Sequence, residues 1–289
     1  MPSWTNPTEP REGLGADPWR AVVRPEGLLP RIDRVVLPGR GPLRDWVERI
    51  WSLSWAEPVP ADFSGVIAHP TVHLTLEGGP PGEIRHGHRL PAGLLHGVVT
   101  ERFAVDLPAP GWVVGLHLTP GAIFDLTGTE ASTWTGQVVP WDQAWPGWDL
   151  TAVWEARDAL ARAEAIERAA QEMMGGRRPT ADGHRARSVE RLVRTDPSIA
   201  SVADLAARVA LSQRSLQRLC RSHLGVSPRW LLRRARVIDA HQLLSETDLD
   251  VAEVASRLGW YDQAHLTRDY TKLTGTPPVR LRQERREGR

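Results

Sequence analysis

The sequence contains a single cysteine, Cys220, among 289 residues. One cysteine cannot form a disulfide within the chain, and it cannot supply the thiolate pairs of a zinc finger or of a redox CxxC motif. No run of about 18 apolar residues occurs, so we expect no membrane-spanning helix. The first twenty residues contain no basic segment followed by an apolar stretch, so no secretory signal is expected. These absences together favour a cytoplasmic protein.

Common catalytic motifs are also missing. The sequence contains no GxSxG, HExxH or P-loop motif, and no GxGxxG motif between a strand and a helix. Cys220 falls on the predicted inner face of a helix, where a small core residue is more frequent than a nucleophile. We therefore expect no enzyme activity, no catalytic residue and no cofactor.

Lysine is almost absent, since Lys272 is the only one, and arginine supplies nearly all the positive charge. The charge is unevenly distributed although the whole chain carries only +1. Residues 184–289 contain 20 basic and 12 acidic residues, a net charge of +8, whereas residues 1–183 carry −7. A basic half indicates a polyanion such as nucleic acid, although a solvated basic face would give the same count.

The pattern of apolar and turn-forming residues changes along the chain and predicts a two-domain α+β protein. Between residues 63 and 118, short apolar runs alternate with glycine and proline, as in a β-sandwich or a small barrel. The second half is helical throughout. The predicted segments are an irregular arm (1–19), a β-rich effector or oligomerisation domain (20–150), a helical connector (151–176), a linker (177–184) and an all-α domain (185–289).

The basic half contains an internal repeat. VADLAARV (202–209) aligns with VAEVASRL (251–258) at an offset of 49 residues. After one inserted residue the offset becomes 50, and Leu216, Arg218 and Gly225 then align with Leu266, Arg268 and Gly275. Agreement in register over this length predicts one structural unit that is built twice.

Each copy has the pattern of a helix-turn-helix. Ser201 with Asp204, and Asp250 with Glu253, are predicted capping boxes at the start of a short first helix. A tight turn follows, and Ser212 or Asp262 is placed to cap a second helix. The glycine at the end of each second helix is the usual left-handed cap, so each copy is predicted to be two helices joined by a turn.

The outward face of each second helix is polar and rich in arginine and glutamine. These side chains pair bidentately with guanine and adenine edges in the major groove of DNA. The predicted base-contacting residues are Gln213, Arg214, Gln217, Arg218, Gln263, Ala264, Thr267 and Arg268. The predicted phosphate-contacting residues are Ser212, Arg221, Thr271 and Lys272. One such helix could be an ordinary solvated face, but two in register favour a DNA-reading pair.

Residues 228–245 lie between the two copies, and their apolar spacing predicts one long helix. A helix of this length extends about 27 Å. It could hold the two units about one turn of DNA apart, ~34 Å, on the same side of the duplex.

The segment 186–283 resembles the DNA-binding domain of the AraC/XylS family of bacterial transcription regulators. The residues that carry the resemblance are Ala206, Ser212, Leu216, Arg218, Gly225, Ser227, Pro228, Arg236, Ala240, Leu243, Leu244, Val254, Ala255, Gly259, Trp260, Asp262, Gln263, Arg268, Tyr270, Gly275 and Pro278. The resemblance implies seven helices with two helix-turn-helix units, and base reading by Arg218 and Arg268. Cys220, Leu266 and Leu281 depart from the family by replacing aromatic residues.

The front half is similar to the cupin-like sensory domains attached to such regulators, and the phrase GLHLTPGAIFDLTG (115–128) carries this resemblance. By analogy this half senses a ligand or forms a dimer. We expect an effector pocket among the strands, lined by some of Trp51, His69, His73 and Trp112. His86 and His88 could place two imidazoles on one side of a strand, but the glutamate usual after such a pair is missing, so no metal site is predicted.

These patterns predict a sequence-specific transcription regulator that binds double-stranded DNA with two helix-turn-helix units and responds to a small-molecule effector. The alternative is a cupin-type metalloenzyme or metal sensor fused to a DNA-binding module. RNA polymerase and a second copy of the chain remain open as further partners, and no membrane partner is expected. No sequence pattern identifies the effector, the target operator or the direction of regulation.

Overall fold

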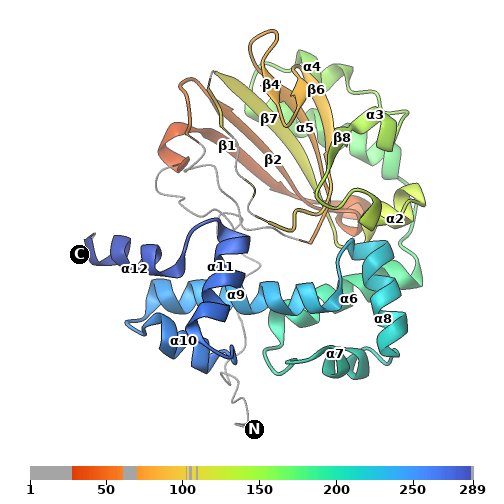
Figure 1. Ribbon diagram of the computed structural model, residues 1–289. Helices are drawn as coiled ribbons and strands as arrows, with labels where there is room; N and C mark the ends of the chain where they lie inside the picture. Colours follow the sequence, from red (N-terminus) through yellow and green to blue (C-terminus); the bar gives the residue numbers. More distant parts are fainter. Residues whose placement is uncertain (1–27, 61–69, 102, 104–105, 109, 288–289) are drawn as a thin grey trace.

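The computed structural model of the protein describes residues 28–60, 70–101, 103, 106–108 and 110–287. A β-sheet with short flanking helices occupies the front half of the chain, and a helical assembly occupies the back half (Figure 1). The strands are β1 (Asp33–Pro38), β2 (Val47–Trp55), β3 (His73–Gly78), β4 (Ile84–Arg85), β5 (His88–Arg89), β6 (Ala92–His96), β7 (Gly111–Leu118) and β8 (Val138–Pro140). The predicted arm 1–19 lies outside the described residues.

Six of the strands form one antiparallel sheet in the order β1-β2-β7-β3-β6-β8, and β4 and β5 form a separate hairpin. The sheet ends at β1 on one side and at β8 on the other, and these two strands do not pair with each other. The small barrel, one of the two predicted alternatives, is therefore not formed by the described strands. A barrel requires strand pairing that runs around the full circle, and here the paired strands leave two edges.

One face of the sheet is apolar and packs against a helix. Ile50, Leu74 and Leu116 are opposed in register on β2, β3 and β7, and all three are fully buried. The helix α5 (Ala159–Met174) covers this face, with Ile166 in the same core cluster. The segment expected as a connector thus contains α4 (Thr151–Glu155) and α5, and α5 packs directly on the sheet.

The other face of the sheet is polar, and we call it the polar sheet face. It carries His73, Thr75 and Glu77 of β3 at alternate positions, as expected for side chains on one side of a strand. His73 is opposed to His96 of β6 and to His117 of β7. Buried polar groups persist only where they bond to one another or bind something.

Short helical elements precede, separate or follow the strands of the front half. They are η1 (Leu29–Arg31), η2 (Gly41–Asp45), α2 (Ala122–Thr127), η3 (Ala131–Thr133) and α3 (Trp141–Ala144). The expected helical turn at 120–128 is present as α2, and it ends at Gly128, whose φ of 73° is the left-handed cap.

The helical half contains the seven helices that the family resemblance implies. They are α6 (Ala181–Thr195), α7 (Val202–Arg208), α8 (Gln213–Leu219), α9 (Pro228–Glu246), α10 (Val251–Arg257), α11 (Gln263–Thr274) and α12 (Pro278–Glu287). The helix α6 begins at Ala181, inside the segment expected to be a linker, because Thr180 caps it by accepting from the Gly183 amide. No helix among the described residues is both long and apolar enough to cross a membrane.

The two copies of the repeat are confirmed as two helix-turn-helix units. Both capping boxes are formed, at Ser201 before α7 and at Asp250 before α10. The turn residues also correspond, since Ala210 has a φ of 53° where Gly259 of the second copy has 75°. Alanine adopts this left-handed conformation only at an energetic cost, whereas glycine adopts it readily. The turn of the first copy is therefore maintained by its packing, and the turn of the second copy by its glycine.

The two units are packed differently. The second unit has a separate core, built from α9, α10 and α11 around Leu258, Leu266 and Tyr270. The first unit shares one continuous apolar cluster with the sheet, in which Leu216 and Leu224 belong to the same cluster as Leu116 of β7. The front half is therefore docked on the first unit through apolar contact.

Candidate nucleic-acid interface

The first recognition helix is α8, which Ser212 caps by accepting from the Ser215 amide. Leu216 lies on the inner face of this helix and is fully buried, and the side chains on the opposite face point outward. The predicted contact residues on this helix are all exposed, namely Ser212, Gln213, Arg214, Gln217, Arg218 and Arg221. Sequence periodicity alone thus located the outward stripe of the first unit.

The second recognition helix is α11, which Asp262 caps by accepting from the His265 amide. Gln263, Ala264 and Arg268 are exposed at positions equivalent to the first helix, and Lys272 is exposed one turn further on. Thr267 and Thr271 are partly buried. The accessible part of this helix is therefore smaller and less basic than that of α8.

The cations of the two helices fall into two groups. Among the described residues, the guanidinium groups of Arg214, Arg218 and Arg268 form no ion pair. Arg221, in contrast, lies 3.3 Å from Glu130, and the Lys272 ammonium lies 3.4 Å from Glu101. Both acidic partners belong to the front half of the chain. The predicted base readers are thus free, and two of the predicted phosphate contacts are held by the front half.

The contact at the first unit is close and involves backbone. The Thr135 hydroxyl donates to the Gly225 carbonyl at 2.7 Å, and a β-carbon on Gly225 would meet this hydroxyl oxygen at 2.7 Å. Gly225 also has a φ of 69°. Glycine is therefore required there both for the helix cap and for the approach of the front half.

The first recognition helix changes its hydrogen-bond pattern where the front half touches it. Residues Cys220–Leu224 form a π turn, labelled η4, that packs against α2, η3 and α6. The equivalent part of α11 remains α-helical up to Thr274. Single π turns inside helices are frequent at functional sites, and this one lies where the two halves meet.

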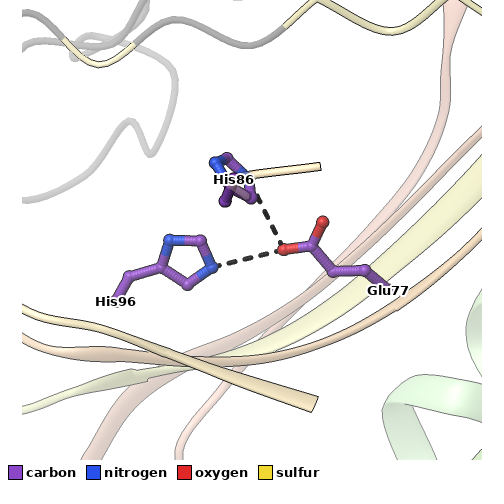
Figure 2. Close-up of side chains that lie close together, drawn as sticks. All are labelled: Glu77, His86 and His96. Atoms are coloured by element: carbon purple, nitrogen blue, oxygen red, sulfur yellow. Dashed lines mark hydrogen bonds and ion pairs between the residues drawn. The ribbon is translucent and has the colours of Figure 1, made fainter. Parts of the chain in front are cut away.

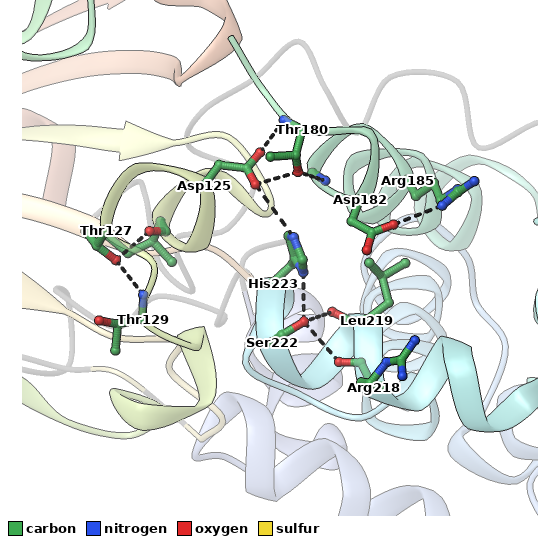
Figure 3. A network of polar contacts seen from close by, with 12 residues as sticks. Asp125, Thr127, Thr129, Thr180, Asp182, Arg185, Arg218, Leu219, Ser222 and His223 are labelled. Atoms are coloured by element: carbon green, nitrogen blue, oxygen red, sulfur yellow. Dashed lines mark hydrogen bonds and ion pairs between the residues drawn. The ribbon is translucent and has the colours of Figure 1, made fainter. Parts of the chain in front are cut away.

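A polar network joins the two halves at this point (Figure 3). Asp125 of α2 accepts from the amide and the hydroxyl of Thr180, at 2.9 and 2.6 Å, and its carboxylate lies 3.7 Å from His223 of the π turn. A β-carbon on Gly183 would lie 2.0 Å from the Asp125 carboxylate. Burial lowers the pKa of His223 despite this carboxylate, so the imidazole is neutral at neutral pH.

The connecting helix α9 has 19 residues, about 28 Å at 1.5 Å per residue, close to the length expected. Beside it a groove is lined by Arg229, Arg233 and Arg236 of α9 and by His265 and Asp269 of α11. Of these arginines the sequence analysis named only Arg236, as part of the family resemblance, and it proposed no DNA contact for any of them. Their spacing of three and four residues, which places them on one stripe of a helix, is the pattern that would have found them.

The residues predicted for an effector pocket do not gather in one place. Trp51 and His73 lie on the polar sheet face, with ring centroids 6.4 Å apart, and His73 stacks on His117 at 4.4 Å. Trp112 lies on the opposite face, where the Arg162 guanidinium of α5 covers its ring at 4.3 Å. Trp112 pairs with Ser54, which is three residues along β2 from Trp51. Successive side chains of a strand point to opposite faces, so Trp112 and Trp51 lie on opposite faces of the sheet. His69 lies outside the described residues.

The structure gathers a different group on the polar sheet face. Glu77, His86 and His96 place their ligand atoms within 4.8 Å of one another. The sequence analysis paired His86 with His88, but the His88 ring instead bonds to the Val138 carbonyl at 3.1 Å. The pairing depended on the register of three strands, which no local spacing encodes.

Comparison with known proteins gives the same division of the chain. A family model described as a helix-turn-helix domain matches residues 205–284, which cover both recognition helices. The matched segment, residues 205–284, has the helix-turn-helix organisation of AraC-family regulators. A second model, a domain of unknown function (DUF6597), matches residues 36–140 and covers the sheet.

The AraC-family domain is similar to curated regulators over about 80 residues. It is 38% identical over 80 residues to the HTH-type transcriptional regulator GbdR of Pseudomonas aeruginosa, covering 28% of this chain and 22% of that protein. It is 35% identical over 81 residues to the HTH-type transcriptional activator RhaS of Escherichia fergusonii, covering 28% of this chain and 29% of that protein. The chain thus matches less than a third of the length of these relatives, which are regulators and not enzymes.

Among solved structures, the DNA-binding domain of AdpA in complex with a target DNA is 32% identical, with a TM-score of 0.29. The match covers 35% of this chain and 88% of that domain.

Proposed function

We propose that this chain is a transcription regulator that binds a specific DNA sequence through α8 and α11, each placed in one of two successive major grooves. The observation that carries the proposal is the pair of capped helices that expose Arg218 and Arg268 at equivalent positions without an ion-pair partner among the described residues. Free guanidinium groups on a capped, rigid helix suit bidentate recognition of guanine.

The charge distribution supports the same function. The net charge of +8 over residues 184–289 supplies attraction to phosphate, which gives affinity but no sequence choice. Arg229 and Arg233 add positive charge beside the second reader. Specificity then depends on the outward side chains of the two recognition helices.

Selection of binding sites from a random DNA library, followed by footprinting with the full-length protein, tests the proposal. We expect a site with two half-sites centred about one helical turn apart, ~10 base pairs. The binding constant should fall with salt at a log–log slope of about −0.9 for each phosphate contacted. As a control, Arg168→Ala on the exposed side of α5 removes one positive charge far from the recognition helices. This variant should leave the selected sequence unchanged. Protection without a preferred sequence would contradict the proposal.

We further propose that the front half controls DNA binding by competing with phosphate for cations. Glu130 holds Arg221 and Glu101 holds Lys272, and both cations lie on or next to the recognition helices. A groove at this contact is lined by residues of both halves, namely Gln217, Arg221, Glu130 and Ser132. An effector bound on the polar sheet face, near Trp51 and His73, would act by shifting this docking.

Glu130→Gln and Glu101→Gln are therefore expected to strengthen DNA binding. Both pairs are largely exposed, so each substitution should raise affinity only about two- to fivefold at low salt. The gain should shrink as salt rises, because exposed charges are screened. Glu172→Gln on α5 is the matched control, since it removes the same charge from an exposed residue that forms no ion pair with the residues the structure describes. Titration of labelled DNA measures the effect, and an equal gain in the control would show a bulk charge effect only.

A further inference from the structure

The polar sheet face contains a buried group of ligating side chains that DNA binding does not use. Glu77 extends from the middle of the sheet, His96 stands at the end of β6, and His86 belongs to the turn of the β4–β5 hairpin. The three side chains point toward one another from these separate elements (Figure 2). Two imidazoles and one carboxylate are the donor set of many zinc sites with one open position.

The distances within the group fit a metal ion. The Glu77 Oε1 atom lies 3.2 Å from His96 Nε2 and 3.7 Å from His86 Nε2. Ligand atoms that surround a tetrahedral zinc at about 2.1 Å are separated by about 3.4 Å. These two separations bracket that value, and all three ligand atoms lie within 4.8 Å of one another, so rotations of the side chains would form the ligand set without movement of the sheet.

The backbone at His86 is arranged to deliver its ring. His86 has a φ of 53° and Gly87 a φ of 81°, the pair of positive values that defines a type I′ hairpin turn. Asparagine and histidine are among the non-glycine residues that adopt a positive φ most readily. The turn therefore accommodates His86 and places its imidazole close to Glu77 and His96.

The surroundings fit a second layer around a metal. The Thr75 hydroxyl donates to Glu77 Oε1 at 2.9 Å, and Arg85 donates to Glu77 Oε2 at 3.2 Å, so both carboxylate oxygens are oriented. The Phe103 ring stacks on His86 at 5.3 Å and meets His96 edge-on at 5.8 Å. Such a layer fixes the orientation of the ligands.

The charge of the group is unbalanced without a cation. Arg85 pairs with both Glu77 and Glu83, so two buried carboxylates share one guanidinium. The Glu83 Oε2 atom is buried without a hydrogen-bond partner among the described residues.

We propose that Glu77, His86 and His96 bind a divalent transition-metal ion, of which Zn²⁺ is the best match to the donor set. The three side chains leave one coordination position open, where a water molecule or an oxygen of a small ligand completes the shell. The site lies in the front half and its test requires no DNA, so it stands or fails independently of the proposed function.

Titration of the metal-free full-length protein with Zn²⁺ by calorimetry tests the proposal, with Co²⁺ as a spectroscopic probe of geometry. We expect one Zn²⁺ per chain, a rise in the thermal midpoint of unfolding, and the absorption bands of four-coordinate Co²⁺. His86→Asn should weaken Zn²⁺ binding by about 100-fold or more. Asparagine tolerates the positive φ of this turn better than most residues, so the hairpin is kept.

His88→Asn in the same hairpin is the matched control and should bind Zn²⁺ as the original chain does, because His88 bonds to a backbone carbonyl instead. Glu77→Gln keeps the shape of the side chain and should also lose the site. Absence of Zn²⁺ binding by the original chain overturns the proposal. Equal affinity in His86→Asn and the original chain would place the metal on other histidines and overturns it as well.

Discussion

Glu190→Lys is expected to lower the free energy of unfolding by about 3–5 kcal/mol, because it removes this counter-ion from the buried charge of Arg234 and places a second cation beside it. Glu190 of α6 and Arg234 of α9 are both almost fully buried and interact electrostatically. Arg234 keeps a pKa of about 10, lowered by burial, so it stays charged at neutral pH. Urea unfolding followed by tryptophan fluorescence measures the loss.

Two further variants separate the buried pair from its exposed neighbour. Arg194 also contacts Glu190, at 3.3 Å, but its side chain is 27% exposed, so Arg194→Ala should cost about 1 kcal/mol or less. The double variant Glu190→Leu with Arg234→Met removes both buried charges together. It should be close to neutral or more stable than the original chain, because the desolvation of both ions is recovered.

The pH dependence gives an independent check on the same pair. Burial raises the pKa of Glu190 in the fold, against the attraction of its two arginines. The folded state therefore holds this proton to a higher pH than the unfolded chain does. Stability should fall as pH rises from the ordinary glutamate pKa through the raised one, and the double variant should lose this slope. A double variant as unstable as Glu190→Lys would contradict the account.

The helical half could be predicted from the sequence because its determinants are local. Capping residues such as Ser201 and Asp250 specify where a helix begins, and the spacing of Leu216 specifies its inner face. The repeat allowed each assignment to be checked against its copy. The docking of Glu130 on Arg221 was not predicted, because it joins residues 91 positions apart through packing that no periodicity records.

The front half was predicted less well because a sheet depends on register. The strand segments around His73, Leu95 and Trp112 were recognised, but their order in the sheet was not. Which face a side chain occupies depends on that register, and a shift of one residue reverses it. This explains why Trp112 was grouped with Trp51, and why His86 was paired with His88 rather than with His96.

Arg218→Ala is expected to weaken binding to the selected DNA site by about 1–3 kcal/mol, roughly 5- to 150-fold, and to relax base preference at one position. Arg268→Ala should do the same in the other half-site. The first effect should be larger, because α8 exposes Arg214, Gln217 and Arg218 together, whereas α11 presents Ala264 and a half-buried Thr267 near Arg268. Titrations on a panel of single-base variants of the site measure both effects.

Arg221→Ala is the matched control on the same helix. Arg221 lies one turn beyond the base-reading positions and is shared with Glu130, so its loss should weaken all sequences about equally. It should also reduce the salt slope by about 0.9, the contribution of one phosphate contact. If Arg218→Ala and Arg268→Ala also weaken every sequence alike, these arginines touch only phosphates. The choice of sequence would then depend on DNA shape rather than on base edges.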